Sequence, residues 1–287
     1  MCSVKFALII ISFLLPLVSF NQMINEMELH NFKVAFNDTY IKNNQIKSVT
    51  GYTSYKKELR PIVEKGSFNQ YTFDEKGKVI QITETFKLSQ QRIDSSTTKF
   101  FYSEDVIDQK ITTNAQGQHT YTYTLNPQNK IEKLSYTRGG VNEKKTLVFE
   151  EFYTYEHPSD TTEVKWFLNR YGKPYQKETY TYNAHKYLIS VEKKLVFGGK
   201  TSLITYTYDD FGRLIQLTET KNNSTLKTVY VYDEYANLIE SNYYKNDTLI
   251  KHEEFIYDSK TALIKALLSK EIETGTITIT KFKVEFL

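Results

Sequence analysis

The sequence is poor in the residues that cross-link small secreted proteins or carry thiol chemistry. Its 287 residues include one cysteine, Cys2, with 11 glycines, 5 prolines and 1 tryptophan. A single cysteine excludes an internal disulfide and a cysteine-based metal cluster. The low glycine and proline content excludes collagen-like and low-complexity sequence. Stability must therefore come from side-chain packing and strand pairing.

An excess of charge of one sign is also missing. The chain has 37 basic and 34 acidic residues, and its formal net charge is +3. The two signs alternate along the chain, and no basic run of five or more residues occurs. Nucleic-acid binding through phosphate contacts is therefore not expected.

The first 22 residues have the pattern of a secretory signal peptide. Lys5 precedes an uncharged, mainly apolar run from Phe6 to Phe20. This run is short for a helix that must cross a hydrocarbon core of about 30 Å, so cleavage is favoured over a permanent anchor. Cys2 precedes the apolar run, whereas a lipidated bacterial cysteine follows it. We predict a secreted or periplasmic protein whose mature chain has no cysteine.

Tyrosine is abundant, with 23 residues, and it recurs in an internal repeat. Each unit has an aromatic residue, any residue, a second aromatic residue and then Asp or Asn. After four further positions come two apolar residues. Such regular self-similarity is typical of repeat architectures. Clear units begin at Tyr71, Tyr180, Tyr206, Tyr230 and Phe255, and weaker ones at Phe100, Tyr121 and Tyr153.

Each unit is predicted to be a β-hairpin. Around Tyr206 and Tyr208 the residues alternate with period 2 before they reach Asp209-Asp210-Phe211-Gly212. Asp at the first position and Gly at the fourth suit a type I turn. The predicted structural turn residues are Asp74, Gly77, Asp209, Gly212 and Asp233. A looser or shifted turn is expected where Lys186, Ala236 or Thr261 replaces the glycine, and Asn237 could supply the left-handed conformation in one of them.

The short spacing between units leaves no room for crossover helices. It predicts an all-β antiparallel meander of roughly 14 to 18 strands, two per repeat. Apolar pairs such as Leu214-Ile215 give both faces apolar cover near the turns, which favours a curled or solenoid-like sheet over a flat one. Residues 30–43 predict a short helix, 45–56 the first strand and 277–286 a closing strand. The predicted organisation is a signal peptide (1–22), an N-terminal cap segment (23–66) and a hairpin-repeat domain (67–287).

The segment Tyr206-Thr207-Tyr208-Asp209-Asp210-Phe211-Gly212-Arg213-Leu214-Ile215 resembles the YD-repeat of bacterial Rhs-type proteins. In progressively weaker form the resemblance covers residues 71 to about 270. In that family the repeats form a long β-sheet that can coil into a hollow shell, which encloses a C-terminal effector in the toxin members. Here the repeats are longer and about 20 residues follow the last one, so a toxin cargo has no room. The resemblance implies a short secreted β-repeat protein of the bacterial cell envelope, and it implies no enzyme chemistry.

Motifs for catalysis, cofactor binding and metal binding are missing. The five histidines lie 28 or more residues apart, which is not the spacing of a local metal site. No nucleophile elbow, glycine-rich phosphate loop or His-Glu-x-x-His motif occurs. We expect no catalytic residue, no cofactor and no metal ion. Calcium on the turn acids is the weaker interpretation, because each turn offers only one or two carboxylates.

The recurring aromatic residues are the candidate ligand contacts. Strand pairing would place them in rows, which could stack on sugar rings or grip an extended peptide. The alternative, which we favour, is that they form the core of the sheet with aliphatic residues such as Leu214 and Leu238. The candidates are Tyr180, Tyr182, Tyr206, Tyr208, Tyr230, Tyr232 and Tyr257.

Together these patterns favour a non-enzymatic binding or scaffold protein, secreted or periplasmic. Its partner is left open between a glycan, a peptide and an envelope protein. One alternative is a periplasmic carrier that encloses an apolar ligand. The other is an outer-membrane β-barrel, which the C-terminal run Phe282-x-Val284-x-Phe286 favours. Lys251, Glu253 and Glu254 would put charge on both faces of one predicted strand, so membrane insertion is not expected.

Overall fold

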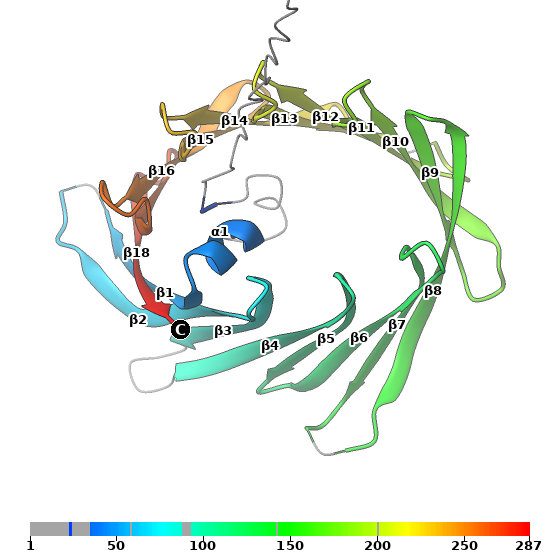
Figure 1. Cartoon of the computed structure of the whole chain (residues 1–287), viewed down its shortest axis with the longest axis horizontal. Coiled ribbons are helices and arrows are strands. Elements are labelled where there is room, and N and C mark those ends of the chain that lie inside the picture. The colour runs from blue at the N-terminus through cyan, green and yellow to red at the C-terminus, as the bar shows by residue number, and fades with distance from the viewer. Residues whose placement is uncertain (1–22, 25–34, 58, 88–92, 142, 200) are drawn as a thin grey trace, which may run out of the picture.

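The computed structural model describes residues 23–24, 35–57, 59–87, 93–141, 143–199 and 201–287. The predicted signal peptide and residues 30–34 of the predicted helix lie outside these ranges. Within them, 18 antiparallel strands and one short helix follow one another along the chain (Figure 1). The elements are α1 (Asp38–Asn43), β1 (Ile46–Lys56), β2 (Val63–Phe73), β3 (Val79–Lys87), β4 (Ile93–Ser103), β5 (Val106–Asn114), β6 (Gly117–Leu125), β7 (Ile131–Gly139), β8 (Thr146–Ser159), β9 (Thr162–Leu168), β10 (Pro174–Tyr182), β11 (Leu188–Leu195), β12 (Thr201–Tyr208), β13 (Leu214–Lys221), β14 (Ser224–Tyr232), β15 (Leu238–Lys245), β16 (Thr248–Tyr257), β17 (Ile264–Glu271) and β18 (Thr276–Phe286).

The sheet closes on itself, because β1 pairs with β2 on one side and with β18 on the other. Val49 of β1 pairs with Tyr71 and with Val284. The all-β meander is confirmed, but the expectation of a curled or solenoid-like sheet is wrong: the strands form a barrel. Closure satisfies the backbone of the first and last strands and leaves no exposed sheet edge.

An Asp or Asn side chain fixes the turn of nearly every repeat. Asp233 Oδ1 accepts hydrogen bonds from the backbone amides of Tyr235 (2.9 Å) and Asn237 (2.8 Å). These bonds hold the chain in the tight turn before the next strand starts. The same pair of bonds forms at Asp74, Asn126, Asn183 and Asp209.

The expectation of looser turns at the replaced glycines is correct in only one of three cases. Ala236 and Lys186 both adopt φ of 65°, close to the 79° of Gly212, and keep the tight turn. Asn237 is therefore not needed as the left-handed residue. The turn that contains Thr261 is one residue longer, and Ala262 there has a φ of 54°. The two side-chain hydrogen bonds of the Asp or Asn compensate for the left-handed residue that follows.

Residues 23–24 and 35–43, which we call the N-terminal segment, lie inside the barrel and pack on part of its inner wall (Figure 1). Met23, Ile24 and Ile41 are almost fully buried against inward side chains of β1, β2 and β13 to β17. Tyr40 of α1 donates a hydrogen bond from its hydroxyl to the carbonyl oxygen of Thr261 (3.1 Å). The hydrophobic core therefore lies inside the barrel, on the side that α1 occupies.

None of the helices among the described residues is long and apolar enough to cross a membrane.

The strand register sorts the side chains into an inner and an outer face, because directly paired residues share a face. Tyr71 and Tyr230 pack on the N-terminal segment and therefore point into the lumen. Pairing followed around the closed sheet then places Lys99, Lys177 and Lys281 outward, near the middle of their strands. The remaining outer face mixes apolar side chains such as Phe101, Trp166, Val231 and Ile256 with many threonines, including Thr50, Thr83, Thr97, Thr122, Thr179, Thr205 and Thr218.

Candidate functional site

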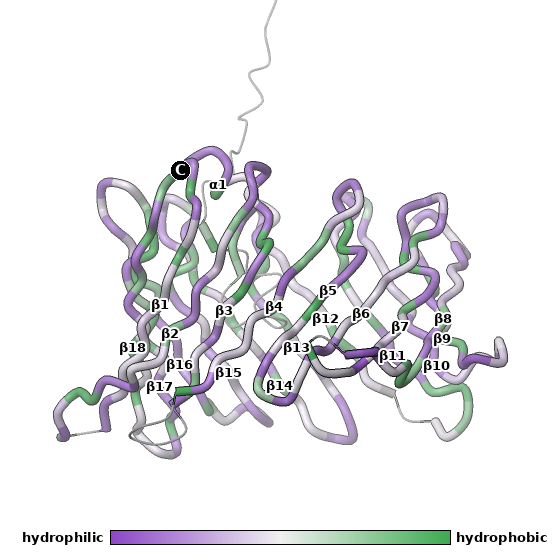
Figure 2. Tube along the Cα trace, turned by 90° about the horizontal axis from the view of Figure 1, so that it is seen from below, coloured by the Kyte–Doolittle hydropathy of each residue, from purple (hydrophilic) through white to green (hydrophobic). Residues whose placement is uncertain are grey.

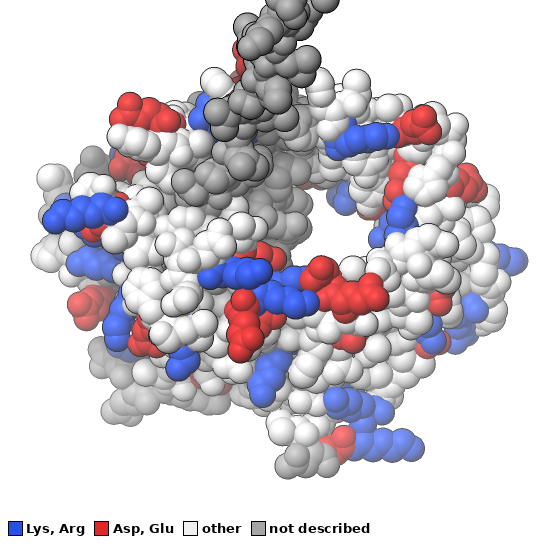
Figure 3. Space-filling view, viewed as in Figure 1, with Lys and Arg blue, Asp and Glu red and all other residues white. Residues whose placement is uncertain are grey.

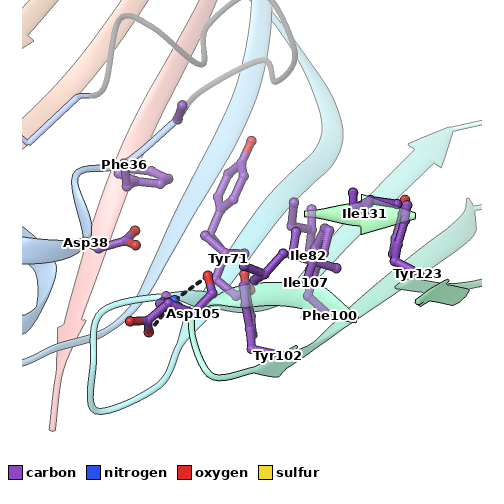
Figure 4. Close-up of a pocket in the computed structure, with 14 residues that line it drawn as sticks. Phe36, Asp38, Tyr71, Ile82, Phe100, Tyr102, Asp105, Ile107, Tyr123 and Ile131 are labelled. Atoms are coloured by element: carbon purple, nitrogen blue, oxygen red, sulfur yellow. Dashed lines mark hydrogen bonds and ion pairs between the residues drawn. The ribbon is translucent and has the colours of Figure 1, made fainter. Parts of the chain in front are cut away.

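The lumen beside α1 contains an apolar cavity of about 550 Å³. The cavity lies between the N-terminal segment and the inner faces of β2 to β7 (Figure 4). Figure 3 shows the end of the barrel that carries α1, where the lumen is open. The apolar side chains that line the cavity include Phe36, Tyr71, Ile82, Phe100, Ile107, Tyr123 and Ile131.

Phe36 joins the N-terminal segment to the barrel wall at one side of the cavity. Its ring makes edge-to-face contacts with Tyr71 (centroids 5.1 Å apart) and Phe73 (5.4 Å). These two residues are the aromatic pair of the first repeat. Aromatic pairs in this geometry are stabilised beyond the area they bury. The cavity therefore has a packed boundary on the side of α1.

The tyrosine hydroxyl groups of the repeats are used within the wall. Tyr102 donates a hydrogen bond to the carbonyl oxygen of Val79 (2.8 Å) on the preceding strand, β3. Burial, with smaller effects of Asp38 and Asp74, raises the pKa of Tyr102 to about 12, so its phenol stays neutral at physiological pH. The wall accordingly offers the cavity uncharged ring faces. The equivalent bond recurs from Tyr155 to Ile131, Tyr208 to Leu188, Tyr232 to Leu214 and Tyr257 to Leu238.

Charged groups border the cavity only at its mouth. Lys78 Nζ forms an ion pair with Asp105 Oδ1 (2.8 Å) and lies 5.0 Å from the centre of the Tyr102 ring. The hydrogen bond from Lys78 lowers the pKa of Asp105. Asp38 of α1 lines the same side (Figure 4). The arrangement suits a ligand with an apolar body, because Lys78 and Asp105 are already paired with each other at the mouth.

The described residues contain no group of three or more histidine, cysteine, aspartate or glutamate residues able to hold a metal ion. The turn acids are spread around one end of the barrel, and each bonds to the backbone amides of its own turn. The hydrogen bonds therefore favour a role of these acids in turn geometry over a role as calcium ligands.

None of the seven predicted ligand-contact tyrosines lines the cavity. Five of them pack on the N-terminal segment or on its wall as part of the core: Tyr206, Tyr208, Tyr230, Tyr232 and Tyr257. Tyr180 and Tyr182 face the lumen away from this cluster, and the hydroxyl of Tyr180 donates a hydrogen bond to Glu178 Oε2 (2.5 Å). A ligand-contact role for these two residues stays a prediction.

Apart from Tyr71, which begins a clear unit, the repeat aromatics that line the cavity belong to the weak units. Phe100 and Tyr102 belong to the unit that begins at Phe100. The unit assigned to Tyr121 begins two residues later in the structure, because Asn126 is its turn residue and Tyr123 takes the first aromatic position. Aligning the turn Asn instead of the first tyrosine would have revealed this register from the sequence.

No family model matches the chain, and no curated protein matches it. A porin-like protein from Bacteroides uniformis is a similar solved structure, with 13% identity, a TM-score of 0.45 and coverage of 84% of this chain and 98% of the other. A porin-like protein from Bacteroides vulgatus has 12% identity, a TM-score of 0.35 and coverage of 84% and 99%. The complex TcdB2-TccC3 has 11% identity and a TM-score of 0.32, and it matches 76% of this chain over 12% of its own. These are distant likenesses, and the YD-repeat resemblance stays a resemblance of short motifs.

Proposed function

We propose that the protein is a non-enzymatic binding protein of the cell envelope, secreted or periplasmic, that holds an apolar ligand in the lumen cavity. The observation that carries the proposal is the cavity of about 550 Å³ beside α1, bounded by aromatic and aliphatic side chains. Its volume is in the range of small-molecule sites, which are mostly apolar with a few polar groups. Each methylene group that a ligand buries there contributes about 0.8 kcal/mol.

Charged side chains on the outer face of the barrel favour a barrel that is surrounded by water. Lys99 and Lys281 are exposed at the middle of β4 and β18 and point outward. On the lipid face of a membrane barrel, a lysine at mid-depth costs about 2–4 kcal/mol. Threonine and glutamine also occupy outward positions, so the apolar residues of that face, such as Phe101, Val231 and Ile256, do not form the continuous band of a membrane barrel.

An outer-membrane barrel is the second candidate, because the antiparallel sheet of 18 strands is closed. Closure removes all sheet edges, as a membrane-spanning sheet requires. In a membrane barrel the C-terminal row of Phe282 and Val284 would face the lipid, but here it faces the lumen. Phe282 and Val284 pack on the core inside the barrel and do not face outward.

A fluorescent apolar probe, N-phenylnaphthylamine, tests the proposed cavity. Ile107 lines the cavity, so Ile107→Trp should fill it and weaken probe binding by about tenfold or more. Gln109 lies on the same strand and points outward, so Gln109→Trp is the matched control and should bind like the wild type. Thermal unfolding of both variants checks that the barrel is intact.

Two results would count against a lumen site. One is the absence of any fluorescence gain with the wild-type protein. The other is an equal loss in both variants, which would mean that the probe binds elsewhere or that tryptophan on β5 disturbs the fold.

A further inference from the structure

The two ends of the barrel carry different side chains. Because the strands run up and down in sequence order, alternate connections lie at the same end. The β2–β3, β12–β13 and β16–β17 turns lie at the end that carries α1. We call the turns at the opposite end the far rim; its described residues include 57, 59–62, 140–141, 143–145, 169–173 and 196–199. Figure 2 shows this rim at the bottom of the barrel, opposite α1.

Large apolar side chains are exposed on the far rim. Leu59 is 99% exposed, Phe197 82% and Tyr171 70%. They come from three different turns, so the exposed apolar surface is distributed around the mouth. Ile62 and Val141 add to it from the first and the fourth connection at this end. The α1 end also exposes Phe211 and Tyr235, each 74%, so the far rim is distinguished as an interaction surface by its apolar residues together with its charge.

Basic residues accompany these apolar side chains. In the sequence, Lys57 and Arg60 lie within two residues of Leu59, with Glu58 between Lys57 and Leu59, and Arg170 and Lys173 lie within two residues of Tyr171. Among the described turn residues of the far rim, basic residues outnumber acidic ones: Lys57, Arg60, Lys144, Lys145, Arg170 and Lys173 stand against Glu143, Asp247 and Glu273. At the α1 end acidic residues outnumber basic ones among the described turn residues, because several turns there have two adjacent acids, as in Asp209-Asp210 and Asp233-Glu234.

We propose that the far rim docks on an anionic lipid surface. Apolar side chains next to lysine and arginine are the combination that binds at a bilayer surface: the apolar groups enter the headgroup region and the cations pair with anionic lipids. Docking in this way requires no strand to enter the hydrocarbon core, so the polar outer wall stays in water. The acidic α1 end would then point away from the membrane. The inference is independent of the proposed lumen ligand.

Co-sedimentation with lipid vesicles tests the docking surface. The full mature chain should sediment with vesicles that contain phosphatidylglycerol and only weakly with pure phosphatidylcholine vesicles, and added salt should release it. The double variant Leu59→Asp/Phe197→Asp removes two exposed apolar contacts. It should lower vesicle affinity by about tenfold or more. The control is Phe211→Asp/Tyr235→Asp, which changes two side chains, each 74% exposed, at the α1 end.

A charge variant separates the electrostatic part of docking. Lys57→Glu/Arg60→Glu should lower affinity for phosphatidylglycerol vesicles by about fivefold for each lysine or arginine removed. Lys260→Glu, at the α1 end, should leave it unchanged. All rim variants should bind N-phenylnaphthylamine like the wild type, which distinguishes failure of docking from failure of the lumen site. The proposal is overturned if the wild type does not sediment with phosphatidylglycerol vesicles, or if the α1-end variants lose as much affinity as the rim variants.

Discussion

Gly77 lies directly against Asp38 of α1. A Cβ atom on Gly77 would be 2.0 Å from the carbonyl oxygen of Asp38, and the glycine has a φ of 87°. The turn between β2 and β3 thus touches the backbone of the helix inside the barrel. This approach positions α1 beside the cavity, since Asp38 and Phe36 both line it.

The first prediction is that Gly77→Ala destabilises the protein more than Gly172→Ala. Both glycines have positive φ, and a left-handed alanine costs about 1–2 kcal/mol at either position. Only Gly77 meets backbone atoms, whereas Gly172 has nothing within 4 Å of an added Cβ. Urea unfolding of both variants gives the two free energies. Equal losses would show that the turn does not support α1.

The second prediction concerns the repeated tyrosine hydroxyl bond. Tyr232→Phe removes the bond to the carbonyl oxygen of Leu214 (2.6 Å) and should lower the free energy of unfolding by about 1 kcal/mol. Tyr235→Phe in the same hairpin is the control, because Tyr235 is exposed. If the two variants unfold at the same urea concentration, the hydroxyl bonds do not hold neighbouring repeats together.

The third prediction concerns the turn acids. Asp233→Ala should lower the free energy of unfolding by about 0.5–2 kcal/mol, as the loss of a helix cap does, because two amide hydrogen bonds disappear. Asp233→Asn should keep most of the stability, since Asn183 makes the same two bonds in its own turn. The melting temperatures of the two variants decide the matter. If the alanine variant is as stable as the asparagine variant, the side-chain hydrogen bonds of Asp233 do not stabilise the turn.

The fourth prediction is a loss of stability in alkali. Burial raises the pKa of Tyr102 and of Tyr155 to about 12 in the folded protein, from about 10 in an unfolded chain. Below pH ~10 both states are neutral and the full stability is present. As the pH rises from about 10 to about 12, these tyrosines ionise mainly in the unfolded chain, so the free energy of unfolding falls.

Urea unfolding at a series of alkaline pH values measures this dependence. Tyr102→Phe should make the decline shallower, and Tyr235→Phe, which changes an exposed phenol, should not. A free energy of unfolding that stays constant through this range in the wild type would show that these tyrosines reach water in the folded barrel.

Local signals predicted most of the architecture. The alternation around Tyr206 and the Asp209 turn act within about ten residues, so they could be recognised in one unit and carried to the next. Closure could not be recognised in the same way, because it depends on the pairing of Val49 with Val284, which lie at opposite ends of the chain. The expected first and last strands were placed correctly, but no local pattern indicates that they meet.

The site was harder to predict than the fold. The clear repeat units, such as those at Tyr206 and Tyr230, drew attention as ligand contacts, yet the N-terminal segment packs on that side of the lumen. The cavity lies between the clear unit at Tyr71 and the weaker units that follow it, where Phe100 and Tyr123 stand in less regular sequence. Which side of the barrel is filled depends on tertiary docking at Gly77, and repeat strength does not encode it.

We expect the barrel to stand in water, because Lys99 and Lys281 lie at the middle of its outer face while the hydrophobic core and the apolar cavity lie inside it. The most direct measurement is to express the full precursor in a Gram-negative host, release the periplasm by osmotic shock and wash the membranes with high salt. A barrel that stands in water should be recovered without detergent in the shock fluid, or in the salt wash if the far rim docks on lipid. A protein that stays in the outer membrane after the salt wash and needs detergent for release would contradict this expectation, and would make the outer wall a lipid-facing surface.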